Sequence, residues 1–263
     1  FLYNLGMLKK LDSGIEFNQW RIESNKSTIL NSDEMESLQD RLNAPLLPEM
    51  VFGHNFIRFS RVSSDFQIDF NANSALATWA ENAANQTVDV AYSETWSKER
   101  SDVIEKMTRQ TYDWTFTTRF KGDITVTENT TISKTDEQIP IALLTSMDPI
   151  LFYDDVILFE DELADNGSAI MNIKLRVMPR CFFALQRFFL RVDDVFFRVI
   201  EIRLFHQFGQ QFLLREYQEK YSTSKELLDK HEELVEDKSQ IANTDLISSL
   251  LPVVDNYVEK ITF

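Results

Sequence analysis

The chain has 263 residues, of which 43% are hydrophobic and 26% charged. This composition excludes an intrinsically disordered chain, which lacks the apolar surface to offset its ordering entropy. With 42 acidic residues against 27 basic ones, the net charge of −15 argues against nucleic acid and anionic membranes as partners. Cys181 is the single cysteine, which excludes internal disulfides and fits a reducing, cytoplasmic location. No apolar run approaches the ~20 residues of a membrane span.

The N-terminal half alternates strand and helix patterns. Alternating apolar positions predict strands at residues 18–23, 57–60, 66–70, 88–92, 114–118 and 124–126. A helix is expected at residues 32–42, capped by Ser32 or Asp33, since Asp33 and Glu36 have capping-box spacing. Residues 71–74 are expected to cap a second, short helix that runs through Trp79.

Residues 156–217 carry the clearest pattern, that of an antiparallel meander with short connections. Residues 182–192 are apolar on both faces and predict a central strand covered on both sides, followed by a two-residue hairpin loop, Asp193-Asp194. Helices are expected at 223–237 and 245–251, and a last strand at 257–261 closes a sheet edge. The fold class is α+β, with antiparallel sheets and helices packed against them, in a single domain spanning residues 1–263.

Catalytic and cofactor-binding motifs are missing from the sequence. His54, His206 and His231 do not stand at metal-ligand spacing, and an apolar strand around Cys181 raises the pKa of its thiol and makes it inert. There is no G-x-S-x-G elbow, P-loop or G-x-G-x-x-G motif. We therefore expect no cofactor, no metal and no enzymatic activity.

Carboxylates are abundant in one segment, between residues 154 and 165. This acidic cluster consists of Asp154, Asp155, Glu160, Asp161, Glu162 and Asp165. Two of its members could act as the acid and base of a hydrolase, which stays open as an alternative function. Carboxylates at strand ends are more often solvated or paired with arginine, and several arginines follow in the meander.

Several strings resemble a known family in their order and spacing. They are Leu47-Pro48-Glu49-Met50-Val51-Phe52-Gly53, Ile68-Asp69-Phe70-Asn71-Ala72, Tyr112-Asp113-Trp114-Thr115-Phe116-Thr117-Thr118, Leu158-Phe159-Glu160-Asp161-Glu162-Leu163, Arg176-Val177-Met178-Pro179, Arg187-Phe188-Phe189-Leu190-Arg191-Val192-Asp193 and Leu214-Arg215-Glu216-Tyr217. Together they resemble the TIPRL family, the TOR signalling pathway regulator-like proteins, from about residue 17 to residue 263.

This resemblance implies a non-enzymatic regulator with an antiparallel α+β fold. Family members bind and restrain catalytic subunits of type 2A-like serine/threonine phosphatases, and they govern assembly with other regulators, including alpha-4-type proteins. The acidic balance of this chain suits such a partner, because a phosphatase active site holds metal ions and admits negatively charged substrates. A structural adaptor that does not touch the catalytic subunit is the second alternative.

The resemblance also implies partner-facing positions, which are Asn71 to Ser74, Ile139, Val199 and Glu201. The chain has Ser74 where the family pattern leads us to expect Asp, Val199 in place of Met, and Glu201 in place of Asp. Ile139 precedes a proline in an expected loop and is an exposed apolar candidate. Strand alternation places Val199 and Glu201 on one face, which we expect to be the wetter one, although Val199 could equally belong to the core.

The segment at residues 223–243 departs from the family pattern. It is more charged and more regularly helical, and it is read as a species-specific helical insertion at the surface.

Overall fold

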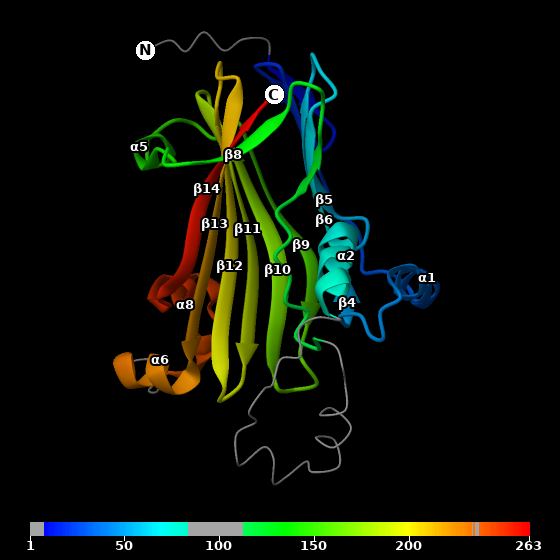
Figure 1. The fold of residues 1–263 in the computed structure, drawn as a ribbon, viewed down its shortest axis with the longest axis vertical. Helices are drawn as coiled ribbons and strands as arrows, with labels where there is room; N and C mark the ends of the chain where they lie inside the picture. The colour runs from blue at the N-terminus through cyan, green and yellow to red at the C-terminus, as the bar shows by residue number, and fades with distance from the viewer. Residues whose placement is uncertain (1–7, 84–112, 233, 235–236) are drawn as a thin grey trace.

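The computed structural model describes residues 8–83, 113–232, 234 and 237–263, and these form an α+β fold as predicted (Figure 1). The strand expected at 88–92 lies outside the described residues. The strands make two antiparallel sheets. The small sheet has the order β1 (Lys9–Leu11), β2 (Gly14–Phe17), β3 (Trp20–Asn25), β5 (Phe56–Arg61), β6 (Gln67–Asn71) and β7 (Asp123–Thr125).

The large sheet contains the predicted meander. Its order is β4 (Met50–Val51), β9 (Phe152–Asp161), β10 (Gly167–Val177), β11 (Cys181–Val192), β12 (Phe196–Gln207), β13 (Phe212–Thr223), β14 (Val253–Thr262) and β8 (Thr131–Thr135). Strand β8 was not predicted, and it pairs with β14, so the C-terminal strand does not close the sheet.

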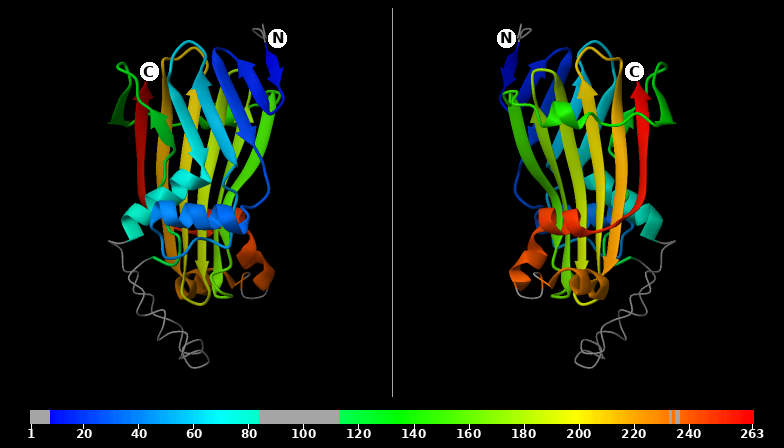
Figure 2. Two further views of the ribbon diagram at one scale, coloured as in Figure 1. Left: turned by 90° about the vertical axis from the view of Figure 1, so that its right-hand side faces the viewer. Right: turned by 90° about the vertical axis from the view of Figure 1, so that its left-hand side faces the viewer.

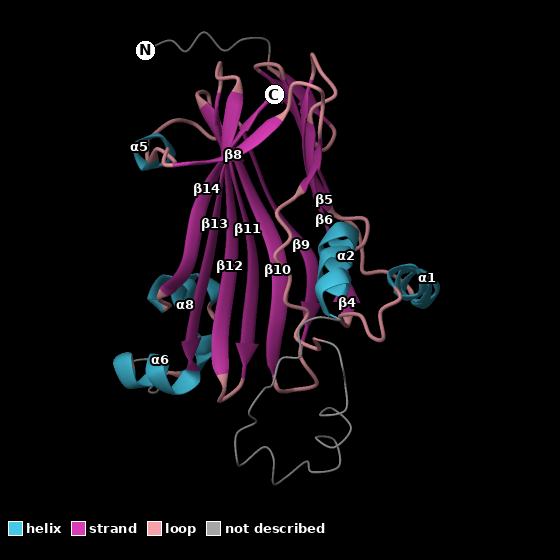
Figure 3. Ribbon diagram, in the orientation of Figure 1, coloured by secondary structure: helices cyan, strands magenta, loops and turns pink. Residues whose placement is uncertain are grey.

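Helices cover both faces of the large sheet. They are α1 (Ser32–Leu42), α2 (Ala72–Ala83), α5 (Ile141–Leu144), α6 (Ser224–Lys230), the 3-10 helix η1 (Lys238–Ala242) and α8 (Thr244–Leu250). The small sheet, α1 and α2 lie on one face, which we call the inner face, whereas α5, α6 and α8 lie on the opposite, outer face (Figures 2 and 3).

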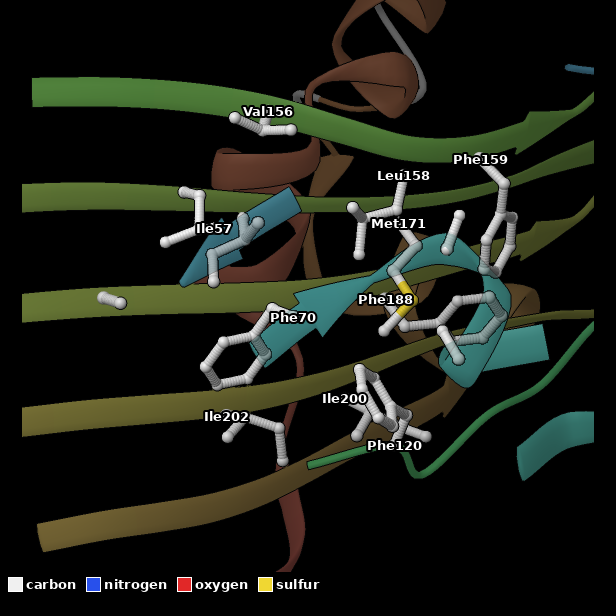
Figure 4. Close-up of a cluster of buried hydrophobic side chains, with 14 of the residues drawn as sticks. Ile57, Phe70, Phe120, Val156, Leu158, Phe159, Met171, Phe188, Ile200 and Ile202 are labelled. Atoms are coloured by element: carbon white, nitrogen blue, oxygen red, sulfur yellow. The ribbon is translucent and has the colours of Figure 1, made fainter. Parts of the chain in front are cut away.

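The main hydrophobic core fills the space between the inner face and the small sheet. Alternate residues of β10, such as Met171 and Ile173, are buried there, while Lys174 between neighbouring core positions is half-buried on the outer face. Ile57 and Phe70 of the small sheet approach Met171 from the other side (Figure 4). The two-residue period of strand side chains thus builds this core directly.

A second layer covers part of the outer face. Helices α6, η1 and α8, which we call the helical cap, bury Leu227 and Ile247 against Phe189, Phe197 and Val199 of β11 and β12. Strand β11 is therefore covered on both sides, as its apolar sequence predicted. Helix α6 ends at Lys230, earlier than expected, and its first turn is closed by a capping box of Thr223 and Glu226.

Three local predictions were wrong. Residues 114–118 form no strand, because the buried Asp113 carboxylate accepts hydrogen bonds from the backbone N–H groups of Thr115 and Thr117 and curls the chain. Helix α1 is capped by Asn31, whose side chain accepts from the N–H of Glu34, because Ser32 already lies inside the helix.

The hairpin loop after β11 is also different. It spans residues 193–195, with an N–H of Val195 donating to the carbonyl of Val192 at 3.0 Å, and Asp194 alone has a positive φ, of 59°. The loop therefore has three residues and not the two that were expected.

Candidate functional site

The junction of β6 and α2 brings Asn71 and Ser74 to an open pocket. The side-chain oxygen of Asn71 accepts a hydrogen bond from the backbone N–H of Ser74 at 2.9 Å, which caps α2 as predicted. Both residues line a cavity of about 780 Å³, which we call the Asn71 pocket. Two positions that the resemblance marked thus share one accessible hollow.

Charged and amide side chains line the walls of the Asn71 pocket. Arg58 donates from Nε to Asp69 at 2.6 Å and lies over the ring of Phe56 at 4.7 Å. Asn71 donates to the other carboxylate oxygen of Asp69 at 2.9 Å. These contacts fix the Arg58 and Asn71 side chains in place, so the pocket is organised before any partner arrives.

A second, smaller hollow adjoins this pocket beside α1. It measures about 310 Å³ and shares Arg41, Gly53, His54 and Asn73 with the first. Asn73 donates to the carbonyl of Gly53 at 3.2 Å, which ties α2 to the β4–β5 connection. The two hollows therefore form one depression running between α1 and α2.

Histidine and glutamate meet at the rim of this depression. Nε2 of His54 lies 3.0 Å from Oε1 of Glu34, and both side chains are exposed. The N–H of Asn31 that donates to Glu34, followed by the hydrogen bond with His54, lowers the pKa of that carboxyl. Sequence reasoning did not find Arg41, His54 or Arg58 as part of a site, because they come from separate elements without a shared motif.

Ile139 was predicted to be exposed, but it does not lie on the surface. It is buried with Met178, Phe205 and Val258 on the outer face of the large sheet, beside α5. The sequence placed a loop there correctly, but this loop lies flat on an apolar sheet surface.

Val199 and Glu201 are also buried, so the expectation of a wet strand face was wrong. Val199 is 0% exposed and Glu201 is 1% exposed. The helical cap covers them: Ser248 of α8 donates from its hydroxyl to Glu201 at 2.8 Å. The Asn71 pocket and these two residues lie on opposite faces of the large sheet.

Glu201 is the centre of an ionic cluster beneath the cap. Arg187 and Arg203 donate to its two oxygens at 2.8 and 2.6 Å, and Nζ of Lys220 lies at 3.5 Å. Burial alone would raise the pKa of Glu201, but these cations, Arg187 foremost, hold it below its ordinary value. Arg187 also pairs with Asp245 of α8, so the cluster joins the cap to the sheet.

The acidic cluster lies in β9 and in the turn that follows it. Asp154 accepts from Ser24 of the small sheet, whereas Asp161 accepts from the backbone N–H groups of Glu49 and Leu163. Seven strand steps separate the two side chains, or roughly 23 Å at ~3.3 Å per residue. That span far exceeds the roughly 5–9 Å between the paired carboxylates of a glycosidase, so Asp154 and Asp161 do not form such a pair.

The remaining candidates have structural environments. Cys181 is buried, which raises the pKa of its thiol to about 11, and His206 is buried among aromatic rings with Nδ1 2.8 Å from the carbonyl oxygen of Phe212. Among the described residues, no group of three or more His, Cys, Asp or Glu side chains could hold a metal ion. Within the same part of the chain, no helix is both long and apolar enough to cross a membrane.

Comparison with known proteins gives one consistent relationship. The TIP41-like family model matches residues 50–228. A TIP41-like protein of Dictyostelium discoideum is 38% identical over 96% of this chain and 94% of its own length. The type 2A phosphatase activator TIP41 of Saccharomyces cerevisiae is 37% identical over 95% of this chain and 74% of its length, and the human TIP41-like protein 35% identical over 94% and 88%. This chain therefore belongs to the TIP41-like family.

Proposed function

We propose that this chain is a non-enzymatic regulator that binds and restrains catalytic subunits of type 2A-like serine/threonine phosphatases. The name of the yeast relative, a type 2A phosphatase activator, supports a phosphatase as the partner. That name points to activation, whereas the family resemblance favours restraint of the isolated catalytic subunit. The experiment below therefore measures the sign of the effect as well as binding.

The Asn71 pocket is the surface that we assign to this partner. It is the observation that carries the proposal, because Asn71 and Ser74 line an open hollow, whereas Ile139, Val199 and Glu201 are buried. Amide groups and Arg58 offer hydrogen-bond donors there, and preorganised donors favour a specific protein contact. Ser74 contributes a hydroxyl where a carboxylate was expected, so it forms a neutral contact.

The wider setting follows from the same resemblance. We place the chain in TOR-linked signalling in the cytoplasm, where an alpha-4-type regulator could join it and the catalytic subunit in a ternary complex. A chain that bound the alpha-4-type protein without touching the catalytic subunit would instead be an adaptor.

The test is binding to a purified type 2A catalytic subunit. Wild-type chain is expected to bind and to lower the phosphatase activity of the subunit at equimolar amounts. Ser74→Arg should weaken binding at least about tenfold, because a long cation fills the pocket mouth and disrupts contacts at its centre. Asn82→Arg, a matched change of an exposed residue at the far end of α2, should bind as wild type does.

Three results would contradict the proposal. If the wild-type chain does not bind the catalytic subunit, the proposed partner is wrong. If binding raises the phosphatase activity, the chain activates the subunit and does not restrain it. If Ser74→Arg binds as tightly as wild type and melts at the same temperature, the Asn71 pocket is not part of the interface.

A further inference from the structure

Three buried nitrogen atoms between the two sheets lack a hydrogen-bond partner among the described residues. They are Nε1 of Trp20 in β3, Nε of Arg61 in β5 and Nε2 of His206 in β12. Trp20 is 0% exposed and His206 is 1% exposed, so bulk solvent does not reach these two rings. The large majority of buried polar side-chain atoms in proteins have a partner, so the three atoms point to a bound ligand.

Strand pairing and ring contacts bring the three side chains together. Trp20 and Arg61 stand opposite each other in the β3–β5 ladder, with the guanidinium carbon of Arg61 5.6 Å from the centre of the Trp20 ring. The rings of Trp20 and His206 lie 4.9 Å apart and are tilted by 58°. Arg61 and His206 also share a neighbour, the ring of Phe263, at 4.9 and 5.9 Å. The three groups therefore surround one small volume with aromatic walls.

The protonation of His206 decides which hydrogen bonds this volume offers. Nδ1 of His206 lies 2.8 Å from the carbonyl oxygen of Phe212, and because a carbonyl only accepts, Nδ1 carries the proton. Burial lowers the pKa of the ring to about 4, so the ring is neutral at pH 7 and its Nε2 is an acceptor. Nε1 of Trp20 and Nε of Arg61 can only donate. The volume thus presents two donors and one acceptor.

A water molecule matches this set of donors and acceptor. Its two lone pairs accept from Trp20 and Arg61, and one of its O–H groups donates to Nε2 of His206. Buried waters in proteins typically make about three hydrogen bonds to groups that otherwise lack a partner. An anion has no proton to give to Nε2, and a metal ion on Nε2 would face two N–H donors and the positive charge of Arg61.

We propose that Trp20, Arg61 and His206 bind one buried water molecule, which joins the small sheet to the large sheet. The main core between the two sheets is built from apolar side chains, whose contacts are not directional. The hydrogen bonds of the water add a directional link from β3 and β5 to β12. Strand β5 also carries Arg58 of the Asn71 pocket, so the water fixes the strand that supplies one wall of that pocket.

The experiment detects the water by nuclear magnetic resonance of the nitrogen-15-labelled chain at pH 7. In water-selective NOE and ROE spectra, the indole N–H proton of Trp20 should show a cross-peak at the water frequency, with the sign of a dipolar contact and not of chemical exchange. Trp79 is the matched control, because it is 1% exposed and its indole N–H donates to the carbonyl of Asp113 at 2.9 Å. Its indole proton should show no such cross-peak.

His206→Phe tests the acceptor. Phenylalanine keeps an aromatic ring but gives the water no lone pair, so the cross-peak between Trp20 and water should disappear. An unchanged Trp79 indole resonance shows that the variant is folded.

Two results would overturn the proposal. If the Trp20 indole proton of wild type shows no dipolar cross-peak with water, the volume is dry. If the cross-peak is present and His206→Phe leaves it unchanged, His206 does not bind the water. Should His206→Phe fail to fold, the nitrogen-15 chemical shift of Nε2 in wild type decides the same question. The shift of a neutral nitrogen that accepts a hydrogen bond supports the site, and the shift of a free nitrogen contradicts it.

Discussion

Polar side chains line an open hollow in the Asn71 pocket but are buried on the sheet surface beneath the helical cap. In the pocket, Asn71 and Ser74 line an open hollow. Under the cap, Glu201 is 1% exposed and has Arg187, Arg203 and Lys220 around it. A carboxylate on a strand is therefore no sign of an accessible face, because a covering layer with matching cations can bury it.

The energetic consequence of this difference is large. When a partly exposed polar residue loses a hydrogen-bond partner, water can replace that partner. A buried ion that loses its partner has no water to replace it. Substitutions at the two regions should therefore separate residues that recognise a partner from residues that hold the fold.

Glu201→Gln is expected to give the largest effect on stability. It removes the charge that compensates the buried Arg187 and Lys220 and the half-buried Arg203, and breaking a buried ion pair costs about 3–5 kcal/mol. In the pocket, by contrast, Ser74→Ala should change the free energy of unfolding by no more than about 0.5 kcal/mol. Urea unfolding monitored by circular dichroism measures both. A Glu201→Gln protein as stable as wild type would mean that the ionic cluster does not hold the cap.

The buried His206 makes the stability of the fold depend on pH. Burial, followed by the charge of Arg61, lowers the pKa of His206 to about 4 from 6.5, so the unfolded chain takes up the proton more readily. This contribution to stability is present above pH 6.5 and is lost as the pH falls through about 4. The loss should amount to about 3 kcal/mol.

Measuring the free energy of unfolding from pH 7 to pH 4 tests this expectation. His206→Phe should flatten the pH dependence. A curve that His206→Phe does not change would assign the acid sensitivity to other groups.

A smaller effect than that of Glu201→Gln or His206→Phe is expected in the loop below the cap. Asp194 has a φ of 59°, a conformation that favours glycine, and Asp194→Gly should raise the free energy of unfolding by up to about 1 kcal/mol. Thermal melts of the two proteins give the answer. A lower melting temperature in the variant would show that Asp194 makes a contact that outweighs its backbone strain.

Sequence alone predicted the meander well because strand alternation is a local property. Met171 to Val177 alternate into the core as expected, and Asn71 caps α2 as expected. The predictions that were wrong depended on elements that are distant in the sequence. Ile139 is covered by the sheet surface under its loop, and β8 forms because β14 offers it an edge.

One signal for the burial of Glu201 was present in the sequence. Residues 182–192 are apolar on both faces, which correctly predicted that β11 is covered on both sides. Since β12 pairs with β11 and places Glu201 beside Arg187, the same cover extends over Glu201. The strand-by-strand alternation argument missed this because it considers one strand at a time. The Asn71 pocket could be anticipated at Asn71 and Ser74 but not at Arg41 or Arg58, which the fold brings from other elements.

The most direct test of the account is hydrogen–deuterium exchange of the chain with and without a purified type 2A catalytic subunit. We expect new protection at residues 53–58 and 69–78 around the Asn71 pocket, and unchanged exchange at residues 197–203 of β12, which the cap already shields. Protection absent from the pocket, together with altered exchange at residues 197–203 and in the cap, would contradict the account and return Val199 and Glu201 to the interface.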